Sequence, residues 1–198
     1  MGPLDWIAGA GLFVLLPIPV YWFVVHPFVG FWRRIGRAAG LWVAGPVAWA
    51  SAGLFLYLFY SRLLNSRNAP VWAVVLGFAL MAVALGVFTR VRRELGGDRL
   101  IGKTELRGGG ELRTDGLYAR LRHPAYAAQM LTMLGLGCLA GTLAFWLVAG
   151  VWWVLLLTAI GLEERELHAR FGPAYDEYRR RVPAFLPLRT GVAVDGRK

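Results

Sequence analysis

The sequence predicts an all-α, polytopic membrane protein with about five transmembrane helices. Hydrophobic residues make up 57% of its 198 residues and charged residues only 17%, whereas soluble domains carry about 25% charged residues. Four windows contain no Asp, Glu, Lys or Arg: residues 6–32, 38–61, 68–89 and 123–162. Because one membrane helix needs about 20 apolar residues, each of the first three windows holds one span and the last holds two.

The basic residues predict which way these helices point. Twenty of the 22 Lys and Arg residues lie in the loop after the first helix, in the loop 90–122 and in the tail from Arg165 onward. The positive-inside rule places the N-terminus outside and the C-terminus in the cytoplasm, as for an integral protein of the cell (inner) membrane whose active site faces the cytoplasm. Topology and attraction to anionic lipid headgroups account for the net charge of +10. No DNA- or RNA-reading motif accompanies this charge, so we expect no nucleic-acid partner.

We expect a single membrane domain over residues 1–198, made of a three-helix scaffold, 1–89, and a cofactor-binding catalytic half, 90–187. The loop 90–122 is the longest polar segment and contains the triplet Gly108–Gly110, which is typical of a hinge. Long loops in compact proteins are often functional, so we interpret this loop as a cover over the cofactor. A solvated basic linker that contacts lipid headgroups is the alternative.

The first helix contains two prolines, Pro17 and Pro19. Proline removes a backbone hydrogen bond, so we expect the regular helix to kink or end there. His26 closes this first span and is interpreted as a solvated cap rather than a ligand.

The next two helices, 41–60 and 71–88, are interpreted as scaffold. Small residues in the second, among them Gly77 and the Ala82-x-x-x-Gly86 pair, are expected to let helix backbones approach closely in lipid.

The last window predicts a helical hairpin. Gly141-Thr142 marks the bend, and the second helix is expected to continue to about Phe171 and to project beyond the hydrocarbon core. Counting outward from the bend, Glu163 mirrors a position near Arg120, within about one helical turn (~5 Å) of His123. A cationic motif with an imidazole therefore meets a carboxylate pair at one membrane surface, and the tail is expected to fold back against it.

The residue types at this meeting point suit a zwitterionic ligand. Arg122 and His123 favour an anionic group, whereas the pair Glu163-Glu164 favours a cationic one. Tyr118 and Tyr126 add flat apolar faces with polar tips. S-adenosylmethionine, with its carboxylate, amine, sulfonium and adenine, would satisfy these groups together.

A metal site is not expected. Glu164 and His168 lie four residues apart on one helix face, but the chain has only three His, too few for the His clusters of membrane di-iron enzymes. An ion pair between these two residues, or a solvated face, is the better interpretation.

Several ordered motifs resemble those of the isoprenylcysteine carboxyl methyltransferase family, whose broad group includes phospholipid methyltransferases. They are Gly-x-Tyr-x-x-x-Arg-His-Pro-x-Tyr at 116–126, Glu-Glu at 163–164, Phe-Gly-x-x-Tyr-x-x-Tyr at 171–178 and Arg-Val-Pro-x-Phe-x-Pro at 181–187. The resemblance covers about 103–187 and implies an integral membrane methyltransferase with S-adenosyl-L-methionine as its cofactor.

The resemblance also implies which residues contact the cofactor. They are Lys103, Gly110, Glu111, Leu112, Arg113, Tyr118, His123, Pro124, Ala125, Tyr126 and Glu163, and the charge argument adds Arg122. Where the eukaryotic prenylcysteine enzymes have an arginine associated with substrate, this chain has Ala159, which argues against a prenylcysteine carboxylate as the acceptor.

We therefore expect methyl transfer to a lipophilic small molecule or lipid that enters from the bilayer. A carboxylate acceptor needs no base, whereas an amine or thiol must lose a proton, which Glu164 or His123 would take as catalytic residues. Two alternatives remain open. One is an NADPH-dependent membrane reductase of the sterol-reductase type, which is similar in its C-terminal helices, and the other is a non-catalytic membrane protein that binds partners or lipids.

Overall fold

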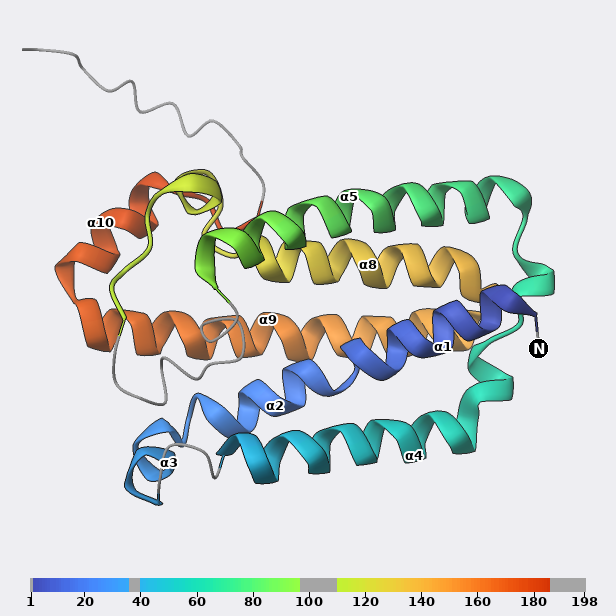
Figure 1. Cartoon of the computed structure of the whole chain (residues 1–198), viewed down its shortest axis with the longest axis horizontal. Coiled ribbons are helices and arrows are strands. Elements are labelled where there is room, and N and C mark those ends of the chain that lie inside the picture. The colour runs from blue at the N-terminus through green and yellow to red at the C-terminus, as the bar shows by residue number, and fades with distance from the viewer. Residues whose placement is uncertain (1, 36–39, 97–109, 186–198) are drawn as a thin grey trace, which may run out of the picture.

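The computed structural model describes residues 2–35, 40–96 and 110–185, and all regular secondary structure within them is helical. The all-α prediction is confirmed for this part of the chain. Figure 1 labels the helices, whose bounds are α1 Pro3–Leu15, α2 Pro17–Val25, α3 Val29–Ile35, η1 Gly40–Ala44, α4 Gly45–Leu63, η2 Ser66–Asn68, α5 Val71–Leu95, η3 Gly116–Ala119, α8 Pro124–Ala140, α9 Leu143–Phe171 and α10 Pro173–Arg181.

Four helical segments among the described residues are long and apolar enough to cross a membrane. They are Pro3–Val25, Trp42–Asn68, Val71–Leu95 and Leu143–Phe171. Helix α8 is also apolar but has 17 residues, slightly fewer than the about 20 of a typical span. A count of five spans therefore depends on α8.

The two prolines interrupt the first helix, as expected, since α1 ends at Leu15 and α2 begins at Pro17. Because Pro19 has no N–H, the carbonyl of Leu15 loses its usual helical donor. The indole Nε1 of Trp152 donates to that carbonyl at 2.7 Å. Helix α9 is thereby tied to the break between α1 and α2.

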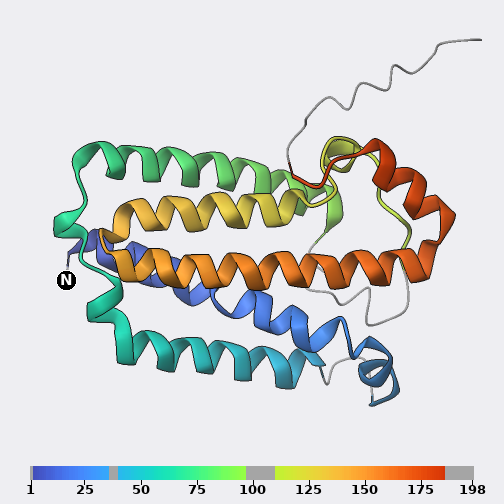
Figure 2. The same ribbon diagram turned by 180° about the vertical axis from the view of Figure 1, so that it is seen from behind.

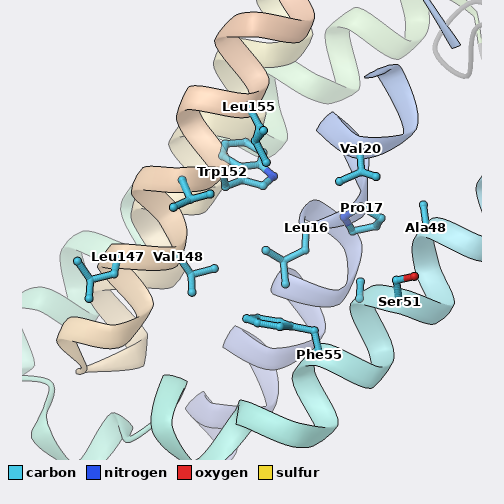
Figure 3. Close-up of a pocket in the computed structure, with 12 residues that line it drawn as sticks. Leu16, Pro17, Val20, Ala48, Ser51, Phe55, Leu147, Val148, Trp152 and Leu155 are labelled. Carbon is cyan, nitrogen blue, oxygen red and sulfur yellow. The ribbon is translucent and has the colours of Figure 1, made fainter. Parts of the chain in front are cut away.

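An apolar groove of about 500 Å³ lies beside this break, between α2, α4 and α9 (Figure 3). Its two polar side chains are both satisfied within the protein. Ser51 donates to the carbonyl of Val47 at 2.8 Å, and Trp152 donates to Leu15. The groove thus presents hydrocarbon and no group that could take part in a reaction.

Helices α5 and α8 touch backbone to backbone at two glycines. A Cβ on Gly77 would lie 2.8 Å from the carbonyl oxygen of Gly135, and a Cβ on Gly135 would lie 2.7 Å from that of Gly77. The expected role of Gly77 in close packing is confirmed. Gly86 differs, because a Cβ there would meet open space.

The hairpin of α8 and α9 bends at Gly141-Thr142, as predicted. Gly141 adopts φ +68°, a left-handed conformation that glycine takes at little cost. The Thr142 hydroxyl accepts from the backbone N–H of Phe145 at 3.2 Å and donates to the carbonyl of Leu63 at 2.6 Å. These bonds cap α9 and join the bend to the end of α4.

Helix α9 is longer than a membrane crossing. Its 29 residues span about 43 Å, against about 30 Å of hydrocarbon core. We take its uncharged part, 143–162, as membrane-spanning and residues 163–171 as projecting. Figures 1 and 2 both place α10, η3 and α3 at the end of the bundle where α9 projects, and the N-terminus at the opposite end.

Candidate active site

The hairpin brings the acidic pair of α9 to the start of α8. Glu164 Oε1 accepts from Arg122 at 2.7 Å (Nη2) and 3.0 Å (Nε), and it lies 3.0 Å from His123 Nε2. The predicted meeting of the cationic motif and the carboxylate pair is confirmed. The contact lies among buried side chains, with 11%, 3% and 14% exposure for Arg122, His123 and Glu164.

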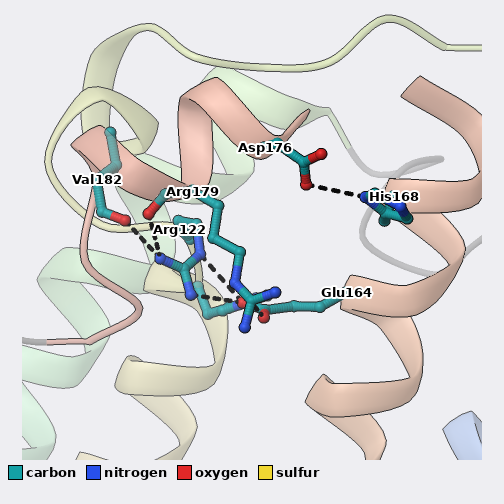
Figure 4. Close-up of polar contacts among 7 residues, drawn as sticks. Arg122, Glu164, His168, Asp176, Arg179 and Val182 are labelled. Atoms are coloured by element: carbon teal, nitrogen blue, oxygen red, sulfur yellow. Dashed lines mark hydrogen bonds and ion pairs between the residues drawn. The ribbon is translucent and has the colours of Figure 1, made fainter. Parts of the chain in front are cut away.

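The C-terminal segment holds this motif in place. The backbone N–H groups of Arg122 and His123 donate to the carbonyls of Pro183 and Ala184, at 2.9 and 3.1 Å. The Arg122 guanidinium also donates to the carbonyl of Val182 at 2.5 Å (Figure 4). The tail therefore folds back against the motif, as expected, and Arg122 joins α8, α9 and the tail.

These partners decide the charge state of Glu164. Burial alone would raise the pKa of the Glu164 carboxyl, but the hydrogen bonds from His123 and Arg122 outweigh burial and lower that pKa to about 2. The second oxygen, Oε2, lies 3.5 Å from Arg179 Nε. A carboxylate with so low a pKa binds a proton weakly, so this geometry favours a role in holding Arg122 and His123.

A cavity of about 590 Å³ opens beside this network. Its wall includes most of the residues predicted to bind the cofactor: Glu111, Leu112, Arg113, Tyr118, Arg122, His123, Ala125, Tyr126 and Glu163. The N-terminal helices also contribute, through Val14, Ile18, Tyr21, Trp22, His26 and Trp49. Both halves of the chain therefore form the cavity.

Two of the predicted cofactor residues that the structure describes, Gly110 and Pro124, are not in the cavity wall. The carbonyl of Gly110 accepts from Arg170 Nη2 at 2.8 Å, which fixes the chain just before the wall begins. Pro124 is buried as the first residue of α8, where its missing N–H costs nothing. Lys103, together with Gly108 and Gly109 of the expected hinge, lies outside the described residues.

Several buried polar atoms of the cavity wall find no hydrogen-bond partner among the described residues. They include Glu163 Oε2, Gln129 Oε1 and the hydroxyl of Tyr175. Burial, with the nearby Glu164 charge, raises the pKa of Tyr175, so its hydroxyl stays protonated and is available as a donor. An unsatisfied buried polar group costs about 1–3 kcal/mol, so several of them around one cavity indicate a polar ligand.

His26 was not predicted as a site residue, and its interpretation as a solvated cap is wrong. It is 7% exposed and lines the cavity, and its Nδ1 lies 2.7 Å from Glu166 Oε2 on α9. The two residues are 140 positions apart, so no local motif links them. The available signal is a histidine at the end of the expected first span.

Of the two interpretations of Glu164 and His168, an ion pair between them is wrong, whereas a solvated face holds for His168 alone. Glu164 binds Arg122 and His123, whereas His168 Nδ1 lies 2.9 Å from Asp176 Oδ1 on the exposed side of α9 and α10 (Figure 4). Among the described residues, no group of three or more His, Cys, Asp or Glu could hold a metal ion.

Comparison with known proteins points to methyl transfer. The family model described as "Phospholipid methyltransferase" matches residues 72–174, just over half of the chain. This range contains the glycine contact of α5 and α8 and the Arg122–His123–Glu164 network.

Curated relatives carry two kinds of name. Protein-S-isoprenylcysteine O-methyltransferase of Schizosaccharomyces pombe is 41% identical over 38% of this chain and 32% of its own length. Methanethiol S-methyltransferase of Crocosphaera subtropica is 35% identical over 39% and 30%. The cobalt-zinc-cadmium resistance protein CzcN of Cupriavidus metallidurans is 41% identical over 37% and 34%. The chain thus covers about a third of each relative, and no solved structure matches it.

Proposed function

Because this chain belongs to the phospholipid methyltransferase family, we propose that it is an integral membrane methyltransferase that uses S-adenosylmethionine and methylates a lipophilic acceptor. Relatives named for transfer to oxygen and to sulfur support the reaction type. The methyl donor, the acceptor and the roles of the site residues are parts of this proposal.

The observation that carries the proposal is the set of unsatisfied polar atoms around the cavity, Glu163 Oε2, Gln129 Oε1 and the Tyr175 hydroxyl. S-adenosylmethionine has an amine and ribose hydroxyls for the two oxygen acceptors, and ring nitrogens and a carboxylate for the tyrosine donor. The cavity volume of about 590 Å³ lies within the range of about 300–1,000 Å³ that is usual for small-ligand sites.

Other side chains of the wall supply the remaining contacts. Arg113 and His123 would receive the carboxylate, and Tyr118 and Tyr126 offer flat faces for the adenine. Arg122 donates to Glu164 and to the carbonyls of Val182 and Arg179, so we assign it to holding the site together. The bound donor would supply a methyl group activated on a sulfonium sulfur. The chain's part is to hold both reactants close together and to exclude water.

The apolar wall of the cavity suits the acceptor. It is formed largely by the N-terminal helices and α5, through Val14, Ile18, Trp22, Trp49 and Phe88. We propose that residues 90–187 bind the donor from the cytoplasm, while residues 1–89 receive the acceptor from the bilayer, within one domain.

Binding measurements on the purified full-length protein test this function. Calorimetric titration is expected to detect S-adenosylmethionine and not NADPH. The Glu163→Gln variant should bind about 10- to 100-fold more weakly, because a hydrogen bond to a charged group is worth about 1.5–3 kcal/mol. Glu177→Gln is the matched control, since Glu177 is exposed on α10 and pairs with Arg180 and Arg181.

Each other outcome favours a named alternative. Binding of NADPH alone would support the membrane reductase, and binding of neither ligand would support a non-catalytic membrane protein. If the donor binds, transfer of a labelled methyl group into a native lipid extract identifies the acceptor.

A further inference from the structure

His26, which lines the cavity from the N-terminal half of the chain, forms a second histidine–carboxylate pair with Glu166 of α9. His26 follows the last residue of α2, and its Nδ1 lies 2.7 Å from Glu166 Oε2. Its ring also stacks on Trp22, with centroids 4.9 Å apart and planes 21° from parallel. With Nδ1 engaged and the ring held flat, Nε2 is the nitrogen that can meet a ligand in the cavity. A carboxylate that orients an imidazole in this way prepares it to accept a proton.

This imidazole lies close to the proposed donor site. Glu166 and Glu163 are three residues apart on α9, so they share one helix face with Cβ atoms about 5–6 Å apart. Glu166 holds His26, and Glu163 carries the unsatisfied oxygen assigned to the cofactor. His26 is therefore about one helical turn from the position where the donor would be held, on the side formed by the acceptor-binding helices.

The other candidates for a base are already committed to structure. Glu164 is held as a carboxylate by Arg122 and His123, and it accepts on Oε1 from both. His123 uses Nε2 for this contact. The contact of His26 with Glu166 uses neither Glu164 nor His123, and His26 lines the same cavity.

We propose that His26, oriented by Glu166, is the general base of the reaction, and that the acceptor is therefore a thiol or an amine rather than a carboxylate. This inference rests on the proposed methyl transfer. The S–H or N–H bond of the acceptor breaks and its proton passes to His26 Nε2. The electron pair left on sulfur or nitrogen forms the new bond to the methyl carbon, while the donor's carbon–sulfur pair stays on sulfur and leaves a neutral thioether. A carboxylate is ionised at neutral pH and would need no such base.

The class of acceptor is tested first with the full-length protein and native membranes. Methyl groups from labelled S-adenosylmethionine are transferred into the membrane extract, and the products are treated with alkali. Methyl esters release their label as methanol, whereas S-methyl and N-methyl products keep it. We expect alkali-stable label. Alkali-labile label, or donor binding without any labelled product, would overturn the inference, while absence of donor binding would instead overturn the proposed function.

The role of His26 is tested with His26→Gln, Glu166→Gln and the matched control His168→Gln. His168 also pairs with a carboxylate, Asp176, but on an exposed surface away from the cavity. We expect His26→Gln to lower the transfer rate at neutral pH about 100- to 1,000-fold and to leave the affinity for S-adenosylmethionine unchanged. Glu166→Gln should have a smaller effect of the same kind, and His168→Gln none.

The dependence of the transfer rate on pH distinguishes a general base at His26 from a purely structural role of this residue. Without the base, the rate should rise with pH as the acceptor ionises by itself, so His26→Gln recovers in alkaline solution. A variant that had merely loosened the fold would not recover. The charged groups that face the same cavity are Glu111, Arg113, Arg122, His123, Glu163 and Arg170. The wild type and His168→Gln share all these groups. If the transfer rate of His26→Gln depended on pH in the same way as that of His168→Gln, the assignment of His26 as the general base would be refuted.

Discussion

Glu164 illustrates how a single carboxylate can organise a site without reacting in it. Its oxygens contact Arg122, His123 and Arg179, and Arg122 in turn donates to the carbonyls of the tail. Breaking a buried pair is costly because it leaves a buried charge without a partner. Glu164 thus sets the position of the tail, of the start of α8 and, through them, of the cavity wall.

The low pKa of Glu164 leads to a prediction of how stability depends on pH. The ordinary value is 4.5 and the folded value about 2, so the folded state holds this proton less tightly than the unfolded chain does. The ionised carboxylate contributes its full stability above about pH 5 and loses it as the pH falls toward the folded pKa. At neutral pH, Glu164→Gln should cost about 2–3 kcal/mol.

Thermal unfolding in detergent, followed by tryptophan fluorescence, measures this effect. The gap in melting temperature between wild type and Glu164→Gln should stay constant from neutral pH to about pH 5 and should narrow below it. Asp176→Asn, which removes an exposed pair, should change little. If the difference in melting temperature did not decrease in strong acid, the ionised form of Glu164 would not be what stabilises the fold.

At the scale of elements, the position of His123 depends on how closely α5 and α8 approach. The two helices meet backbone to backbone at Gly77 and Gly135, and Met81 also lies against Gly135. His123 immediately precedes α8, so a change in the spacing of these helices would carry the site with it.

Gly135→Ala is therefore expected to destabilise the protein by about 1–3 kcal/mol, as overpacked substitutions do. The added Cβ would lie 2.7 Å from the Gly77 carbonyl oxygen and 2.7 Å from Met81 Cγ. The Met81 side chain can move away, whereas the Gly77 backbone cannot. Gly150→Ala on α9 is the matched control, because a Cβ there meets open space. Denaturation in detergent compares the variants. Equal stability of Gly135→Ala and Gly150→Ala would contradict this prediction, because α5 and α8 could then move apart without a loss of stability.

At the scale of the whole molecule, the sequence predicts how deep each residue lies in the membrane better than it predicts which helices lie side by side. Uncharged windows and the Gly141 bend fix how far each residue lies along the bundle, so the meeting of Glu164 with His123 could be foreseen. The contact of His26 with Glu166 could not, because it depends on which helices lie side by side. The shapes of the side chains decide which helices are neighbours, as at the glycine contact of α5 and α8, and the pattern of charges carries no information about these shapes.

The same reasoning explains the C-terminal clamp. The tail is expected to fold back against the central motif, but the bonds from Arg122 and His123 to the carbonyls of Pro183 and Ala184 involve no side chain of the tail. Sequence patterns describe side chains, and so a contact made through backbone carbonyls leaves little trace in them.

The direction in which the bundle crosses the membrane is the last property to test. Twenty of the 22 basic residues lie in segments expected on the cytoplasmic side, and moving them across would oppose the attraction of anionic headgroups.

Cys138 is the only cysteine, so a Cys138→Ala background allows single reporters at opposite ends of the bundle. Asn68→Cys places one in η2, and Glu177→Cys places one on α10. A maleimide that cannot cross membranes should label the first variant in intact spheroplasts and the second only in inverted vesicles, with no label in the background protein. The reverse pattern would put the cavity on the outer face, where a donor supplied from the cytoplasm could not reach it.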